Sequence, residues 1–332
     1  MGHGIDTERD FHLGLEMAWH RLTKVLPVIR REDFPAVERL PLFYALPDGQ
    51  LREWTGTTVP VSLDDGLPVG VSSGESYGEF SPRDAFDHVG KVLAGTRYTV
   101  SSAGMIFNRS RWFLSVDLDE LRDVSRQGEK FHLVWSGGLA KNQSPSCNLS
   151  HVRAVCANTV RIAREQGDAL FSARLTRNFT SHLEAAQSEI ERAVGMARVF
   201  NLTLGALEQT PATVDEARSV YAGELAEAGA DLASGRSRNA LDGMVALFQR
   251  GAGNDGRTRA DVLNGFTEFY GRGDGGQSRK DPFARWTSAE FGSFADRKAA
   301  FASAVAGAAG WDRLAATGRD ALADARRGAV AV

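Results

Sequence analysis

The feature that most constrains the fold of this chain is a change in hydrophobic periodicity between its two halves. Up to about residue 150, short runs of β-branched and aromatic residues alternate with turn residues, which is typical of antiparallel strands. After about residue 180, apolar residues recur every three or four positions, which is typical of amphipathic helices. We therefore predict an α+β fold, with an α+β domain over residues 1–179 and a helical region over residues 180–332.

Strand-like patterns occur in five segments of the first half: LREWTGTTVPVSL (51–63), LPVGVSSGESYGEF (67–80), TRYTVSSAGMIF (96–107), RSRWFLSVDL (109–118) and KFHLVWSGGL (130–139). One helix is predicted among them at residues 81–95, because Ser81 suits the N-cap, Pro82 the first helical position and Gly95 the C-terminal end. Residues 107–109 are predicted to form a hairpin tip. Helical patterns in the second half cover residues 181–209, 213–229, 238–251, 260–273 and 294–310.

The segment HVRAVCANTVRIARE, residues 151–165, is predicted to form a helix that completes a β-β-β-α core. At about 100° per residue, Cys156 shares an apolar stripe with two valines and Ala163, while Arg153, Arg161 and Arg164 occupy the flank beside it. This placement favours a packing role for Cys156, because a buried free cysteine behaves as a small hydrophobe. A catalytic thiol is the alternative, and so is a zinc site formed with other cysteine and histidine residues: Cys147, His151 and His132.

Asp117 and Asp119 alternate to the same face of a predicted strand and form the other candidate metal site. Such a pair can hold Mg²⁺ for a nuclease reaction, but this interpretation requires a third ligand and a positioned base. The sequence contains no Walker A motif. We therefore predict no metal and no cofactor, and the nuclease stays an alternative.

The composition predicts a cytoplasmic protein. Two cysteines are too few for a disulfide framework, and the charged N-terminal segment does not resemble an export signal. No apolar run approaches the roughly 20 residues that are needed to span a bilayer.

Positive charge is concentrated in one part of a chain whose net charge is −3. Residues 97–164 contain ten Arg or Lys against five Asp or Glu, with aromatic residues between them. Basic side chains that contact phosphates, beside rings that can stack on bases, are typical of proteins that bind single strands. The predicted nucleic-acid contacts are Arg109, Arg111, Lys130, Lys141, Arg153, Arg161, Arg164 and Trp112. For Trp112, burial in the core is the favoured alternative.

Several segments resemble a phage and plasmid family catalogued as domain of unknown function 932. The resemblance is carried, in order, by MAWHRL, LPVGVSSGESYGEFSPRDAFDHV, RSRWFLSVDL, HVRAVCANT and TRADVLNGFTEF. Its most specific pieces are Arg153-x-Val-Cys-x-Asn-Thr159 and Leu263-Asn264 followed by Thr267-Glu268. The chain departs from the family at residues 136–153, where members carry a Ser-His-Asp-Gly-Ser-like loop, and at residues 270–272, where they carry an Asp-His pair.

The resemblance implies a sheet-then-helix order similar to that of phage annealing proteins of the RecT type. The expected function is therefore single-stranded DNA binding and strand annealing by a non-enzymatic homo-oligomer, with the predicted helix at residues 180–206 as a candidate interface. A protein-interaction factor that acts against a host defence is the remaining alternative. No membrane partner is expected.

Overall fold

The computed structural model describes residues 11–13, 29–70, 73–74, 80–106, 109–118, 129–139, 144–153, 158–162, 171–172, 189–251, 253–272, 289 and 291–330. For some of these it describes the backbone alone, namely residues 11–13, 73–74, 129–130, 151–153, 158–162, 171–172, 189–191, 272 and 328–330. Two compact units are present. The first comprises residues 1–119, 132–149 and 168–194, and the second comprises residues 120–131, 150–167 and 195–332. The division into a domain at residues 1–179 and a helical region at residues 180–332 stays a prediction.

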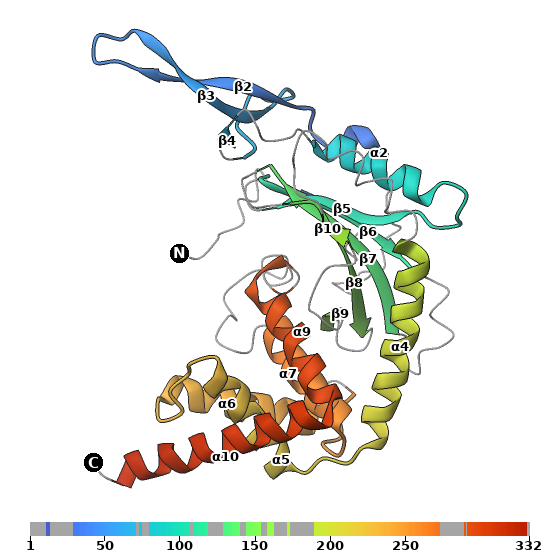
Figure 1. Cartoon of the computed structure of the whole chain (residues 1–332), viewed down its shortest axis with the longest axis vertical. Helices are drawn as coiled ribbons and strands as arrows, with labels where there is room; N and C mark the ends of the chain where they lie inside the picture. Colours follow the sequence, from blue (N-terminus) through green and yellow to red (C-terminus); the bar gives the residue numbers. More distant parts are fainter. Residues whose placement is uncertain are drawn as a thin grey trace. The chain divides into compact units, whose positions relative to one another are not determined.

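An antiparallel sheet, most of which belongs to the first unit, confirms the α+β prediction together with the helical C-terminal region (Figure 1). Its strands are β1 (Phe11–Leu13), β5 (Val100–Ile106), β6 (Arg111–Asp117), β7 (Glu129–Gly138), β8 (Ser146–Arg153), β9 (Asn158–Ile162) and β10 (Phe171–Ser172). The spatial order is β1-β5-β6-β7-β8-β10, and β9 also pairs with β8. The pairing of Ile106 with Arg111 confirms a hairpin between β5 and β6.

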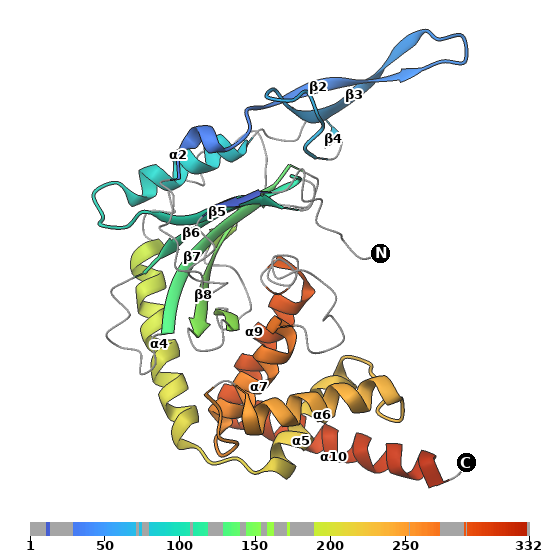
Figure 2. The ribbon, with the colours of Figure 1, turned by 180° about the vertical axis from the view of Figure 1, so that it is seen from behind.

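Helix α2 (Pro82–Leu93) lies over one face of this sheet (Figures 1 and 2). The predicted start signal is confirmed: the Ser81 hydroxyl accepts a hydrogen bond from the Asp84 backbone N–H, and the Asp84 carboxylate accepts one from the Ser81 N–H. Gly95 follows the helix with a φ of +78°, the left-handed conformation that favours glycine. The buried side of the helix is apolar, with Ala85, Val89 and Val92 among its buried residues.

The two faces of the sheet differ in polarity. Residues on β6 alternate, so Trp112 and Leu114 face one side while Arg111, Phe113 and Ser115 face the other. On the second side the Ser115 hydroxyl lies 3.4 Å from Nδ1 of His132, and Nη2 of Arg111 lies 3.5 Å from the Ser136 hydroxyl. The sheet therefore has an apolar face toward α2 and a face that carries buried polar groups.

The prediction of a helix at residues 151–165 is wrong. Strand β8 continues to Arg153, and Asn158–Ile162 form strand β9, which pairs with β8. The β-branched residues Val152, Val160 and Ile162 suit a strand, and this preference outweighs the helical spacing that the same residues satisfy. The β-β-β-α core is corrected accordingly, because β5, β6, β7, β8 and β9 all follow α2 before the next described helix.

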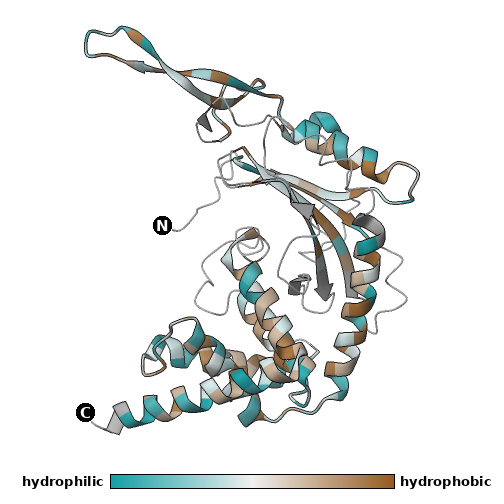
Figure 3. Ribbon diagram, in the orientation of Figure 1, coloured by the Kyte–Doolittle hydropathy of each residue, from teal (hydrophilic) through white to brown (hydrophobic). Residues whose placement is uncertain are grey.

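A long hairpin, which we call the arm, extends from the first unit (Figure 1). It consists of β2 (Val37–Ala45) and β3 (Leu51–Ser62), and two residues of β4 (Ser73–Gly74) pair with β3. The register shifts between Pro41 and Phe43, and Gly56 has a φ of +77° in the same stretch. Apolar and polar residues alternate along the arm (Figure 3).

Helices α4 (Glu189–Gln209), α5 (Val214–Glu227), α6 (Gly235–Arg250), α7 (Arg259–Arg272), α9 (Ser293–Ala306) and α10 (Ala308–Val330) follow the sheet strands in the chain. Helix α7 packs against α5, α6, α9 and β9 within the second unit. The helix predicted at residues 294–310 is interrupted at Gly307, after which α10 begins. Among the described helices, none combines the length and the apolar character that a membrane span requires.

Candidate nucleic-acid interface

An open pocket of about 260 Å³ lies in the first unit at the base of the arm. It is lined by the 3-10 turn η1 (Arg31–Asp33), the start of β2, Pro60 of β3, the start of α2 and the end of β7. Three guanidinium groups line it, from Arg31, Arg39 and Arg83, against one carboxylate, from Asp84. The pocket therefore carries an excess of positive charge.

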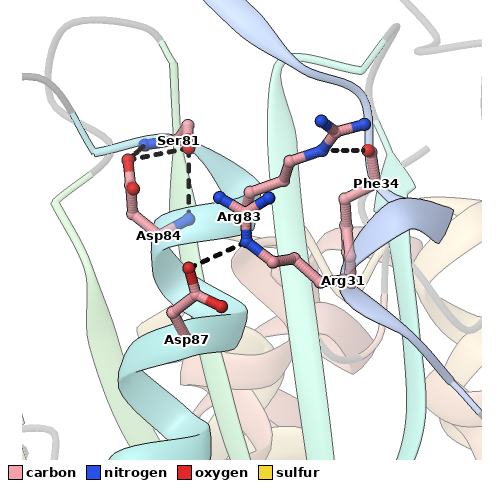
Figure 4. A network of polar contacts seen from close by, with 6 residues as sticks. All are labelled: Arg31, Phe34, Ser81, Arg83, Asp84 and Asp87. Carbon is pink, nitrogen blue, oxygen red and sulfur yellow. Dashed lines mark hydrogen bonds and ion pairs between the residues drawn. The ribbon is translucent and has the colours of Figure 1, made fainter.

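Arg31 is fixed at the pocket by helix α2. Its Nε donates a hydrogen bond of 2.8 Å to Oδ2 of Asp87, one turn into the helix (Figure 4). This hydrogen bond raises the pKa of Arg31 above its ordinary value. Over the described part of the chain, the terminal Nη groups of Arg31 donate no hydrogen bond, so they remain available for a ligand.

Arg83 is also held in place by a hydrogen bond, in this case to the backbone directly after η1. Its Nε donates a hydrogen bond of 2.8 Å to the carbonyl oxygen of Phe34 (Figure 4). Its Nη2 lies 4.0 Å from Oδ1 of Asp64. Phe34 is fully buried and packs its ring 6.0 Å from that of Phe86 on α2. The buried ring therefore fixes the carbonyl that positions Arg83.

The capping box of α2 occupies another part of the lining. Both the backbone N–H and the hydroxyl of Ser81 donate to the Asp84 carboxylate, at 2.8 and 2.7 Å (Figure 4). This carboxylate is thus bound to the helix start, beside Arg83 and not in an ion pair with it. Arg39, on β2, reaches across the hairpin to the Thr58 hydroxyl at 3.5 Å.

The chemistry of this lining suits an anion with several oxygens. A guanidinium group presents N–H donors in a plane that matches phosphate and carboxylate oxygens, and it stays charged at every physiological pH. Three such groups at one open pocket can surround a single phosphate of a larger ligand, because the opening lets the rest of that ligand remain outside.

Two of the predicted contact residues lie elsewhere in the first unit. Arg109 has a φ of +56° at the β5–β6 hairpin and forms an ion pair of 2.6 Å with Asp65. Arg111 lies on the polar face of the sheet, close to Ser136. Neither residue lines the pocket.

The prediction that Trp112 stacks on a base is not supported. Its side chain is only 2% exposed and packs against Phe80, with ring centroids 5.8 Å apart. Gly137 on β7 leaves the room for the indole, because a Cβ there would lie 2.5 Å from Cζ2 of Trp112. Trp112 is on the apolar face of the sheet and belongs to the core.

The other predicted contacts belong to segments for which side chains are not described. Lys130 lies at the start of β7, Arg153 at the end of β8 and Arg161 on β9, all in the second unit. Lys141 and Arg164 lie outside the described residues. The helix flank that was predicted to align Arg153, Arg161 and Arg164 does not exist, since the first two lie on paired strands.

The two most specific sequence motifs meet in the second unit. Strand β9, which contains Asn158 and Thr159, packs against α7, which contains Asn264, Thr267 and Glu268. The Thr267 hydroxyl donates to the carbonyl oxygen of Asn264 at 3.1 Å, and Glu268 is buried.

Gly265, between the motif residues, is required for packing, because a Cβ would lie 2.6 Å from the Tyr221 hydroxyl. That hydroxyl donates to the carbonyl oxygen of Val262 at 2.7 Å. The described contacts therefore assign the α7 motif a structural role.

The alternative metal sites receive no support from the described residues. Within those residues, no group of three or more His, Cys, Asp or Glu side chains is arranged to hold a metal ion. Cys147 is buried, whereas Cys156 and Asp119 lie outside the described part of the chain.

None of the three pocket arginines was predicted as a contact residue from the sequence. Arg39 and Arg83 stand alone in the sequence and Arg31 is one of only two adjacent arginines, and the segment that was selected for its basic character begins only at residue 97. Arg83 lies inside the helix that was correctly predicted, so its position on the first turn was the one available signal. Only the packing of η1, the arm and α2 brings the three together.

Comparisons with known proteins identify a family but no function. A family model described as a domain of unknown function (DUF932) matches residues 70–290. No curated protein and no solved structure matches the chain.

Proposed function

Because the chain belongs to the family described as a domain of unknown function, DUF932, which names no activity, we propose a function from the site itself. The protein binds single-stranded DNA through the phosphate backbone and anneals complementary strands. The observation that carries this proposal is the pocket lined by Arg31, Arg39 and Arg83.

Annealing requires that a protein hold a strand without covering the edges of its bases. The pocket offers guanidinium groups for phosphate oxygens, and these contacts are independent of sequence. Trp112 and Trp135, the tryptophans of the sheet, are 2% and 3% exposed and cannot stack on bases in this arrangement. Stacking on these two tryptophans therefore does not compete with base pairing.

The direct test is a fluorescence-anisotropy titration of the full chain with a labelled single strand and with a duplex of the same length, at about 50 and 200 mM salt. We expect affinity for the single strand that falls steeply with salt. Absence of single-strand affinity at low salt would overturn the proposal.

The triple variant Arg31→Ala, Arg39→Ala, Arg83→Ala tests the pocket itself. Loss of the phosphate contact that the three groups form should weaken binding and reduce the slope of log affinity against log salt by about 0.7, the contribution of one phosphate of a single strand. The matched control replaces three arginines of the helical region and changes the net charge equally: Arg257 and Arg327, which are exposed, and Arg218, which is half-buried.

Equal weakening by the two triple variants would show that net charge alone matters and would exclude the pocket. Circular dichroism checks that the pocket variant folds, because Arg83 also bonds to the backbone at Phe34. A triple Arg→Lys variant of the pocket keeps the charge and loses the planar donor geometry. Its affinity for the single strand should therefore lie between that of the wild type and that of the pocket alanine variant. The rate of annealing is then measured from the energy transfer between complementary labelled strands.

A further inference from the structure

The outer half of the arm exposes large apolar side chains. Phe43, Tyr44, Leu51 and Trp54 are 52%, 43%, 69% and 58% exposed. A two-stranded hairpin on its own is only marginally stable in water, and exposed apolar clusters mark interaction surfaces. The outer arm therefore has the composition of a surface that is covered in the assembled protein.

The register of the hairpin sorts these residues onto two faces. Tyr44 pairs with Arg52, and the Tyr44 ring lies 6.1 Å from that of Trp54 in an edge-on arrangement. We call Tyr44, Arg52 and Trp54 the tyrosine face. On the other side Phe43 pairs with Glu53 and Ala45 with Leu51, and these four residues form the phenylalanine face.

Each face combines apolar surface with one charge, and the two charges are opposite. Arg52 is exposed on the tyrosine face and Glu53 on the phenylalanine face. Within the described residues neither side chain forms an ion pair. The two faces of one arm are therefore complementary to each other in charge and alike in apolar character.

We propose that the arm is a self-docking surface, in which the tyrosine face of one copy packs on the phenylalanine face of the next copy. The contact pairs Arg52 of one copy with Glu53 of another and buries aromatic side chains from both. Because two different surfaces meet, the contact is head-to-tail and extends to further copies, as a ring or a filament. This inference does not depend on the DNA-binding function.

A second copy suits this surface better than other partners. The arm contributes Arg39 and Arg52 against Glu38, Asp48 and Glu53, so it lacks the positive excess that a nucleic acid would require. A symmetric dimer through one face would bring two Arg52, or two Glu53, side chains into one interface with no opposite charge from that face, and an excess of like charge disfavours association.

The test uses sedimentation velocity of the DNA-free full chain over a range of concentrations. Arg52→Glu and Glu53→Arg should each abolish assembly, because every contact then opposes like charges. The double variant Arg52→Glu, Glu53→Arg reverses both faces and should assemble as the wild type does. An equimolar mixture of the two single variants should also assemble, since their copies can alternate.

Arg238→Glu is the matched control, because Arg238 is exposed on α6 and forms no ion pair over the described part of the chain. It should leave assembly unchanged. Trp54→Ser together with Phe43→Ser should abolish assembly without a change of charge. Circular dichroism verifies that all variants fold.

A wild-type chain that stays monomeric at every concentration overturns the proposal. So does assembly of either single charge variant, since the contact then does not depend on the opposed charges. Loss of assembly in Arg52→Glu that the double variant does not restore indicates a contact with a different partner surface and also overturns head-to-tail docking. DNA binding is measured separately, so its presence or absence decides the other proposal alone.

Discussion

At the scale of single residues, two glycines in the second unit allow a pair of helices to pack closely. Helices α5 and α10 approach so closely that a Cβ at Gly318 would lie 1.8 Å from the Ser219 carbonyl oxygen. The same contact places a Cβ at Gly223 only 2.0 Å from the Leu314 carbonyl oxygen. Both distances involve backbone atoms, so a side chain there can be accommodated only if the helices separate.

Gly318→Ala should therefore destabilise the protein by about 3 kcal/mol, the upper part of the usual range for overpacking. Urea unfolding measures the change. The control is Gly205→Ala on α4, where nothing lies within 4 Å of the added Cβ, and this substitution should stabilise by up to about 1 kcal/mol. Equal effects of the two changes would contradict the close approach of α5 and α10.

Arg111 and Trp112 illustrate which side-chain positions a local sequence pattern can predict. The adjacent residues Arg111 and Trp112 were assigned to one surface, but strand alternation places them on opposite faces of the sheet. The alternation was predictable once the strand was recognised. By contrast, which face carries the core depends on α2 and Phe80, and those contacts are not encoded locally.

At the scale of elements, the start of a helix was predictable where a capping residue precedes it in the sequence. Ser81 and Thr213 each form a capping box with the residue three positions later, and α2 and α5 begin where predicted. The segment at residues 151–165 satisfied both periodicities, and pairing with β8 decided the outcome. Strand β9 also packs against α7 and α9, which lie far along the chain, so the segment alone could not settle it.

The cap of α5 gives a pH-dependent prediction. The backbone N–H and the hydroxyl of Thr213 each donate to Glu216 at 2.8 Å, which lowers the pKa of Glu216 below its ordinary value. A carboxyl group whose folded pKa is lowered stabilises the fold above its ordinary pKa of about 4.3, and this contribution is lost as the pH falls through the folded value.

Glu216→Gln should thus lower the free energy of unfolding at pH 7 by roughly 0.5 kcal/mol, a modest value because the cap is exposed to solvent. The difference from the wild type should vanish in strong acid. Thermal unfolding at a series of pH values tests this, with the exposed Asp312→Asn as control. A difference that persists unchanged below pH 3 would exclude the charge as its cause.

At the scale of the whole molecule, each unit contains elements that are surrounded by others. Strand β6 has neighbours on both sides, β5 and β7, and α7 packs against α5, α6, α9 and β9. The arm stands at the opposite extreme, since its outer part exposes Leu51 and Trp54. Protection of backbone amides from local opening should therefore be highest in β6 and α7 and lowest in the outer arm.

Hydrogen exchange of the full chain checks the order directly. Amides of β6 and α7 should exchange slowest, and those of the outer arm should exchange fast in dilute protein. Raising the concentration should slow exchange in the arm and leave α10 unchanged, because self-docking covers only the arm. An arm as protected as β6 at low concentration would show that it is already covered within one chain.

The register shift beside Gly56 has a consequence for how this arm can change over evolution. Since successive side chains point to opposite faces, adding two residues to each strand beyond the shift lengthens the arm and keeps its faces as they are. Adding one residue to each strand exchanges the faces relative to the base of the arm. An even number of residues added to each strand thus preserves the direction in which copies dock on one another, and an odd number reverses it.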